Sequence, residues 1–212
     1  MSWCQRSYFA NDGYTDSQLK TFLNCSYIPL FGRRLMGRVR PPVPVIYFCA
    51  LLHAPSIAQA EVESVLEVHF GSIVFRSANI PFTQTTYYER EMGSNLTRLY
   101  LGFAPLRSMG DLAAIKHTTN QLETQWAIDD CRLVNIDPGY LDHAKVVLVT
   151  TKDYSHRLYI GGGMYAEVTL QYRNKSYQPW EWTYPDYRQP VALDFFNRLR
   201  DVYKRQLQES RL

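Results

Sequence analysis

The sequence predicts a single α+β domain in which about three helices pack on a largely antiparallel, mixed sheet. Several short segments alternate apolar and polar residues, as strands do, and most of them follow one another without an intervening helix. Three longer segments carry apolar residues at helical spacing instead. We expect this domain to span residues 36–212, because no linker or internal repeat divides them.

Composition supports a folded protein and excludes few functions. The 212 residues are 46% hydrophobic and 20% charged, which is ordinary for a globular chain. The net charge of +3 is small, because 20 acidic residues accompany 23 basic ones, so the charge does not imply nucleic acid, and we do not expect nucleic acid as a main partner. Four widely spaced cysteines form no CxxC pair and are predicted to be free thiols.

Residues 1–35 lack periodicity and are predicted to form a weakly ordered N-terminal extension. Met36 directly precedes the patterned part of the chain, so the true start of translation is expected near Met36. The alternative is a natively translated extension. The N-terminal peptide of the native protein distinguishes the two interpretations.

The apolar run Val43–Leu52 follows Arg38 and Arg40 and so resembles a signal peptide. Three prolines at its head and its length of about ten residues favour a buried strand over residues 44–52. A membrane span needs about 20 residues. We therefore expect no membrane association and a cytoplasmic location.

The first half of the domain continues with two helices and two strands. Ser56 is expected to cap a helix that ends at Gly71, and strands follow at 72–77 and 96–103. Ser108 and Asp111 resemble a capping box, and the helix after them has an apolar stripe that reaches Trp126.

The second half is predicted to contain mainly strands. Residues 131–137 form a strand that we expect to stop at a turn over 137–140, because proline and glycine occur there. The run 145–151 is apolar on both faces and is expected to be the central strand. A hairpin turning at 161–163, a turn at 173–176 and a helix after Pro190 complete the chain.

Alternation in residues 165–172 places Glu167 on the face opposite Ala166, Val168, Leu170 and Tyr172. Glu167 is then a candidate general base or metal ligand if that face borders a cleft, and a solvated strand residue if it does not.

The segment 152–157 follows the predicted central strand and offers four reactive groups. Lys152 and Arg157 suit a phosphate or carboxylate, and His156 could transfer a proton near neutral pH. A loop held by an internal salt bridge is the alternative. Asp153 and His156 could also bind a metal with Glu167 or Asp137, but no ligand spacing supports this, so no metal is predicted and the cofactor stays open.

The segment 180–188 is rich in aromatic residues and also carries Asp186 and Arg188. Its rings either pack on the sheet or stack on a ligand. The chain lacks a phosphate-binding loop, a dinucleotide-binding glycine motif, a nucleophile elbow and an HExxH zinc motif.

Six segments of the chain match a known family in order: 89–93, 135–140, 150–153, 156–157, 165–170 and 182–187. With them, the chain from residue 44 to residue 205 resembles a bacterial family catalogued as domain of unknown function 4416. The resemblance implies no established reaction. Some relatives carry a GTP-binding label, which this chain does not support, because it has no phosphate loop and Thr151-Lys152-Asp153 misses the guanine-reading spacing by one residue.

Two functions follow as expectations, and RNA binding is a third and weaker one. The first is a small enzyme or binding protein for an anionic small molecule, phosphorylated molecules included. The second is a non-catalytic interaction module that docks a protein partner through residues 180–187. For the first, the expected catalytic residues are Asp137, Asp153, His156 and Glu167, and the expected ligand-binding residues are Lys152, Arg157, Tyr165, Trp182, Asp186 and Arg188.

Overall fold

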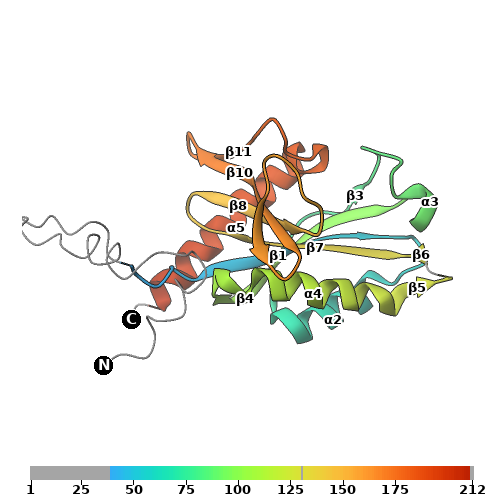
Figure 1. Cartoon of the computed structure of the whole chain (residues 1–212), viewed down its shortest axis with the longest axis horizontal. Coiled ribbons are helices and arrows are strands. Elements are labelled where there is room, and N and C mark those ends of the chain that lie inside the picture. The colour runs from blue at the N-terminus through green and yellow to red at the C-terminus, as the bar shows by residue number, and fades with distance from the viewer. Residues whose placement is uncertain (1–38, 130, 211–212) are drawn as a thin grey trace, which may run out of the picture. The chain divides into compact units, whose positions relative to one another are not determined.

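A nine-stranded antiparallel sheet organises the protein (Figure 1). The computed structural model describes residues 39–129 and 131–210, so the predicted extension 1–35 lies outside the described residues. Residues 42–210 belong to one compact unit, and its α+β architecture confirms the predicted fold class. The strands are β1 (Val45–His53), β2 (Ile73–Arg76), β3 (Ile80–Pro81), β4 (Thr97–Arg107), β7 (Val134–Leu141), β8 (Lys145–Thr150), β9 (Leu158–Gly161), β10 (Met164–Arg173) and β11 (Ser176–Pro179).

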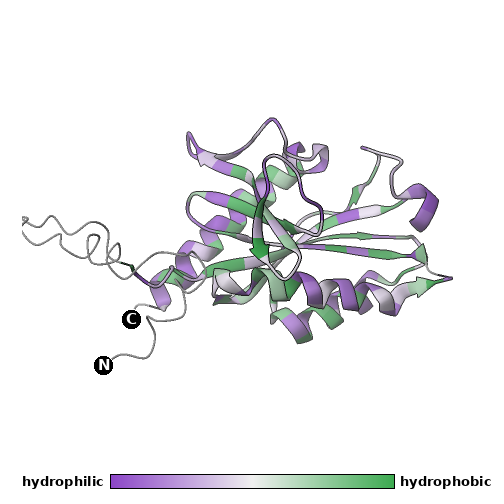
Figure 2. Cartoon of the chain, in the orientation of Figure 1, coloured by the Kyte–Doolittle hydropathy of each residue, from purple (hydrophilic) through white to green (hydrophobic). Residues whose placement is uncertain are grey.

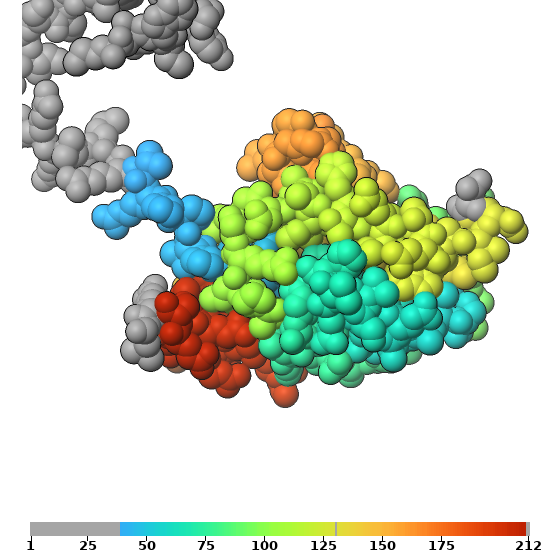
Figure 3. Space-filling model, turned by 90° about the horizontal axis from the view of Figure 1, so that it is seen from below, coloured from blue at the N-terminus to red at the C-terminus, as the bar shows by residue number. Residues whose placement is uncertain are grey.

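Three long helices cover the two faces of the sheet. α2 and α4 lie on one face and hide it when the protein is seen from that side (Figure 3), whereas α5 packs on the opposite face. The helices are α2 (Gln59–Phe70), α3 (Glu89–Met92), α4 (Leu112–Glu123) and α5 (Pro190–Glu209), with a separate small hairpin of β5 (Ala127–Ile128) and β6 (Cys131–Arg132). Within the described ranges, no helix combines the length and the hydropathy needed to cross a membrane.

β1 is the most deeply buried strand, because β4 and β7 pair with its two edges and helices cover its two faces. Its alternate residues enter different cores: Tyr47 and Cys49 face α2 and α4, and Ile46 and Phe48 face α5. Colouring by hydropathy shows the strands as mainly hydrophobic and the outer surfaces of the helices as mainly hydrophilic (Figure 2). The expectation that residues 145–151 form the central strand is therefore wrong, since β1 and β7 lie further inside the sheet.

The predicted start of the first helix also needs correction. α2 begins at Gln59, its N-cap is Ala58, and no side chain caps it, so Ser56 does not have the expected role. The predicted end is confirmed, because Gly71 has φ +93° and its N–H donates to Glu67 O.

A bulge in β10 changes which faces its residues share. The pairing of β10 with β8 shifts register between Val168 and Leu170, so that Thr169 is an extra residue. Consequently Ala166 and Val168 pack on the core beside α4, but Leu170 belongs to the core beside α5. The predicted common face of Ala166, Val168, Leu170 and Tyr172 is therefore wrong beyond Val168.

The predicted turn at 137–140 is wrong, because β7 runs through Pro138 and Gly139. β7 pairs with β1 over its whole length, but its ladder with β8 covers only Gly139–Leu141. Before Gly139 the two strands part and the sheet splits. The backbone of Ile136 points to the side that β8 has left, as its contacts with helix α4 show: its N–H donates to Glu123 Oε1 (2.7 Å) and its C=O accepts from Lys116 Nζ (3.0 Å).

Pro138 lies two residues further along β7, so its nitrogen points to the same side as that of Ile136. Because proline has no N–H, the departure of β8 leaves no donor unsatisfied at this position. Gly139 is required for close packing, since an added Cβ would lie 2.6 Å from Phe48 Cζ and would also clash with Val147 O. Pro138 and Gly139 thus allow the sheet to split rather than turn.

Candidate functional site

A cavity of about 640 Å³ lies where β7 and β8 part. Asn135 and Asp137 of β7 line one side, and Val149 and Thr150 of β8 line the other. A volume of this size suits a small molecule. The remaining wall comes from β4, α4, the loop before α3, and residues 184–187. The ionisable acids and bases that line the cavity are Arg98, Lys116, Arg132 and Lys152 together with Glu123, Asp137, Glu167 and Asp186.

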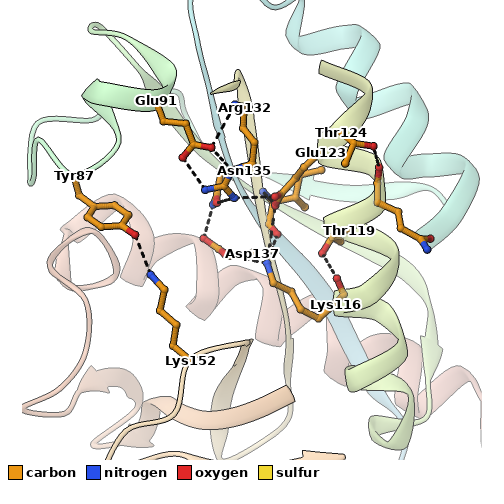
Figure 4. A network of polar contacts seen from close by, with 12 residues as sticks. Tyr87, Glu91, Lys116, Thr119, Glu123, Thr124, Arg132, Asn135, Asp137 and Lys152 are labelled. Atoms are coloured by element: carbon orange, nitrogen blue, oxygen red, sulfur yellow. Dashed lines mark hydrogen bonds and ion pairs between the residues drawn. The ribbon is translucent and has the colours of Figure 1, made fainter. Parts of the chain in front are cut away.

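Asp137 is at the centre of the polar network (Figure 4). Its Oδ1 accepts a hydrogen bond from Lys116 Nζ at 3.4 Å, its Oδ2 accepts one from Asn135 Nδ2 at 2.8 Å, and Arg98 Nη1 lies 3.9 Å from Oδ2. Burial alone would raise the pKa of Asp137, but Lys116 and Arg98 with these hydrogen bonds hold the pKa below its usual range. With 30% of its side chain exposed, Asp137 presents a negative charge to the cavity at neutral pH.

A second part of the network links α3, α4 and β7 through Arg132. Its guanidinium donates to Glu91 (Nε to Oε1, 2.6 Å) and to Glu123 (Nη1 to Oε2, 2.9 Å). The hydrogen bond from Arg132 lowers the pKa of Glu91, whereas burial raises the pKa of Glu123. Arg132 thus donates to both acids, and Glu123 also accepts a hydrogen bond from the N–H of Ile136. This part of the network therefore supports the cavity wall, and few of its polar groups remain available to a ligand.

Arg98 differs from the other cavity cations because its hydrogen-bonding capacity is not used. Its side chain is 4% exposed, and Nη2 lies 3.2 Å from Asp186 Oδ2 without the geometry of a hydrogen bond. Within the described part of the chain, Nε and Nη1 of Arg98 and Oδ2 of Asp186 have no hydrogen-bond partner. Burial raises the pKa of Asp186, although the charge of Arg98 opposes this shift. Buried polar groups are nearly always hydrogen-bonded, so this pair of residues requires an explanation.

Glu167 reaches the cavity but is already held from behind. Its side chain is 1% exposed, and its Oε2 lies 2.9 Å from Arg157 Nε and 3.2 Å from His156 Nε2. Arg157 also donates to the backbone O of Lys152 and to Tyr184 Oη. Arg157 therefore ties the 152–157 loop and residue 184 to β10, and its donors are used within the protein.

Lys152 also lines the cavity, where it points to Tyr87 and lies apart from the network around Asp137 (Figure 4). Its Nζ donates to Tyr87 Oη at 3.1 Å and lies 4.9 Å from the centre of the same ring. Tyr87 is 64% exposed. This contact joins the 82–88 loop to the end of β8.

The structure brings together four of the predicted site residues, Asp137, Lys152, Glu167 and Asp186, in the cavity wall. His156, Arg157 and Trp182 form a layer behind Glu167, where the rings of His156 and Trp182 stack at 5.3 Å. Trp182 also donates its indole N–H to Val168 O.

Three predicted residues lie away from the cavity. Asp153 is exposed in its loop and is absent from the cavity lining. Tyr165 packs against Tyr159. Arg188 donates to the backbone oxygens of Thr183, Trp180 and Glu181. Its side chain therefore stabilises the conformation of the segment 180–188.

The sequence interpretation missed Arg98 and Lys116. A signal for each was present: Arg98 alternates with Tyr100 on the inner face of a strand, and Lys116 and Glu123 lie two helical turns apart in the apolar stripe of α4. Charged residues in buried rows are rare unless they are paired or functional. Among residues 39–129 and 131–210, no group of three His, Cys, Asp or Glu side chains is placed to hold a metal ion.

The fold and the cavity define an α+β protein with a charged internal site. The sequence profile of the family described as Domain of unknown function (DUF4416) matches residues 43–203, and the chain belongs to this family. No curated protein and no solved structure matches the chain.

Proposed function

We propose that the protein binds a small anionic molecule in the cavity between β7 and β8, with Arg98 as the anion receptor. The observation that carries the proposal is the buried guanidinium whose Nε and Nη1 have no hydrogen-bond partner among the described residues. A ligand oxygen would complete these donors with charge-assisted hydrogen bonds. Phe82 lies under the guanidinium, with 5.2 Å between its ring centre and Cζ, which is within cation–π distance.

Lys152 is the second cation in this proposal and acts at the entrance. Its ammonium is exposed and, among the described residues, contacts the hydroxyl and ring of Tyr87, which is itself exposed. Exposed lysines attract anions before they bind, and a ligand oxygen could replace the Tyr87 hydroxyl. We assign Arg157 to the support of Glu167 instead, because its donors are already used.

If the protein is an enzyme, Asp137 and Asp186 are the residues that we assign to acid and base chemistry. Burial raises the pKa of Asp186, and neighbouring cations lower the pKa of Asp137. Two carboxyl groups whose pKa values are displaced in opposite directions suit a group that takes up and releases a proton, which is Asp186, and a partner that stays charged, which is Asp137. Both face the cavity beside Arg98.

The alternative function, docking of a protein partner through residues 180–187, has less support. Trp180 and Trp182 stack on each other at 5.1 Å, and Tyr187 is buried. Tyr184 accepts a hydrogen bond from Arg157 and lines the cavity. These contacts favour a wall of the small-molecule site over a surface for a partner.

We place this function in the cytoplasm. Cys49 and Cys131 are free thiols, and Cys49 is buried in the core. Free cysteines are typical of reducing compartments.

The test is a thermal-shift screen against carboxylates, sugar phosphates and nucleotides. A ligand at about 100 times its Kd stabilises the native state by about 2.7 kcal/mol, which raises the Tm of a chain of this length by about 5 to 10 °C. For a compound that binds, we expect Arg98→Lys to weaken binding about tenfold or more, because lysine cannot supply the planar pair of donors. Lys152→Ala should weaken it about three- to tenfold.

Lys204→Ala is the matched control, since Lys204 is an exposed lysine on α5 that pairs only with Asp201 among the described residues. It should leave the shift unchanged. A compound that binds wild type, Arg98→Lys and Lys152→Ala equally would show that the site lies elsewhere. No shift with any anion would refute the proposal.

A further inference from the structure

The floor of the cavity offers a donor and an acceptor side by side. Arg98 contributes the donors Nε and Nη1, and Asp186 contributes the acceptor Oδ2, 3.2 Å from Arg98 Nη2. Tyr187, the next residue, has a buried hydroxyl that also lacks a hydrogen-bond partner within residues 39–129 and 131–210. All three residues line the cavity. A ligand that only accepts hydrogen bonds would leave Asp186 unsatisfied.

The charges around this floor limit the charge of the ligand. The cavity lining contains as many acids as bases, and two of the acids, Asp137 and Asp186, lie within 3.9 Å and 3.2 Å of the same guanidinium. Arg98 is therefore largely neutralised before a ligand arrives. A doubly charged phosphate would place two negative charges beside two carboxylates, which is unfavourable in a buried site. A single negative charge is easier to accommodate.

We infer that the ligand is a monocarboxylate with a neighbouring hydroxyl or ammonium group, in which the carboxylate accepts from Arg98 and the neighbouring group donates to Asp186. The inference rests on the proposed function and narrows it from anions in general to hydroxy or amino acids. Such a ligand satisfies the donors of Arg98 and the acceptor of Asp186 together. The raised pKa of Asp186, caused by its burial, is consistent with a carboxyl group that gains from a hydrogen-bond donor.

Isothermal titration calorimetry of the full chain with four six-carbon probes tests the inference. Gluconate carries hydroxyl groups, norleucine carries an ammonium group, hexanoate carries neither, and glucose 6-phosphate replaces the carboxylate by a phosphate. We expect gluconate or norleucine to bind at least about tenfold more tightly than hexanoate and glucose 6-phosphate, because a hydrogen bond to a charged group has this effect on affinity. Whichever of the two binds more tightly identifies the hydroxy or the amino class.

Asp186→Asn provides the second measurement, because asparagine keeps the volume of aspartate and removes its charge. We expect the preference over hexanoate to fall to about threefold or less. Asp194→Asn, on the exposed face of α5, is the control and should keep the preference. If Asp186→Asn does not fold, the comparison of the four probes on the wild-type chain decides alone.

The outcomes separate this inference from the proposed function. Equal or tighter binding of hexanoate, or tightest binding of glucose 6-phosphate, would overturn the inference and leave the anion site intact. If other anions bind but gluconate, norleucine and hexanoate do not, the inference is also overturned and the anion site again stays intact. If no anion binds the wild-type protein, both the inference and the proposed function fail.

Discussion

Asp137 shows how single residues set the electrostatics of the cavity. It lies between Lys116 and Arg98, two cations that are more than nine-tenths buried. Neither cation could remain charged there at low cost without a nearby anion. Asp137 therefore stabilises the fold and, through its exposed edge, also shapes the site.

Asp137→Asn should lower the free energy of unfolding by about 2 to 3 kcal/mol at pH 7, because it leaves Lys116 and Arg98 with less compensating charge. The pKa of Asp137 is lower in the folded protein than in the unfolded chain, where it is about 3.9. Its contribution is thus complete above about pH 5, begins to fall as the pH approaches the unfolded pKa, and is lost as the pH falls through the folded pKa. Urea unfolding at several pH values should show a gap between wild type and variant that closes towards pH 2.

The control is Asp201→Asn, which removes an exposed acid that lies 3.7 Å from Lys204. Surface ion pairs of this kind contribute little to stability. The free energy of unfolding of Asp201→Asn should therefore differ from that of the wild type by less than about 1 kcal/mol. A gap for Asp137→Asn that stays constant from pH 7 to pH 2 would show that lost packing, rather than lost charge, causes the effect.

At the scale of elements, local signals in the sequence predicted the structure well. Gly71 ends α2, and the glycines at 161–163 form the predicted hairpin turn, each with positive φ. The same signals failed at Pro138 and Gly139, because their effect depends on where β8 leaves β7. No local pattern records a departure of a neighbouring strand. The prediction of a turn was reasonable from the dipeptide and wrong for the fold.

The site, too, was predictable only where a local pattern in the sequence marked its residues. Asp137 and Glu167 could be selected because each is an acid within an apolar strand, and both line the cavity. Arg98 and Lys116 come from β4 and α4, and only the packing of these elements brings them to Asp137. The role of Arg157 could not be foreseen either, because its partner Glu167 lies on another strand.

Gly139→Ala tests the account of the split in the sheet. An added methyl group would lie 2.6 Å from Phe48 Cζ and against the backbone of Val147, so the substitution should lower the free energy of unfolding by about 1 to 3 kcal/mol. Gly110→Ala is the control, since its nearest neighbour is the side-chain oxygen of Ser108 at 3.3 Å. Equal stability of Gly139→Ala and wild type in chemical denaturation would show that β7 does not need glycine at this position.

At the scale of the whole molecule, the split divides the sheet into two parts. β1, β2, β3, β4 and β7 form one part, and β8, β9, β10 and β11 form the other, which in Figure 1 is turned relative to the first. Among the strands that the structure describes, only the ladder of β7 and β8 at Gly139–Leu141 joins the two parts. α4 bridges the parts on one side, where Lys116 contacts β7 and His117 Nε2 lies 2.8 Å from Gly162 O in the β9–β10 turn.

This division predicts an order of stability that hydrogen exchange with mass spectrometry can measure. Peptides from β1 should exchange most slowly, because both edges and both faces of β1 are covered. Peptides from β8 and β10 should exchange together and at least about tenfold faster, because only a short ladder pairs them with the rest of the sheet, and the remaining contacts are with side chains of α4 and α5 rather than with another strand. β9 should exchange fastest of these strands, since it pairs with β10 alone and its side chains are largely exposed.

Binding of a ligand in the cavity should change these exchange rates. Arg98 and Asp137 belong to the first part of the sheet and Lys152 follows β8 of the second, so a ligand that contacts all three holds the parts together. A compound that raises the Tm should therefore slow exchange in β8 and β10 more than in β1. Equal protection of β1, β8 and β10 in the free protein would contradict the division, because it would mean that the sheet opens as a single unit despite the split at Pro138.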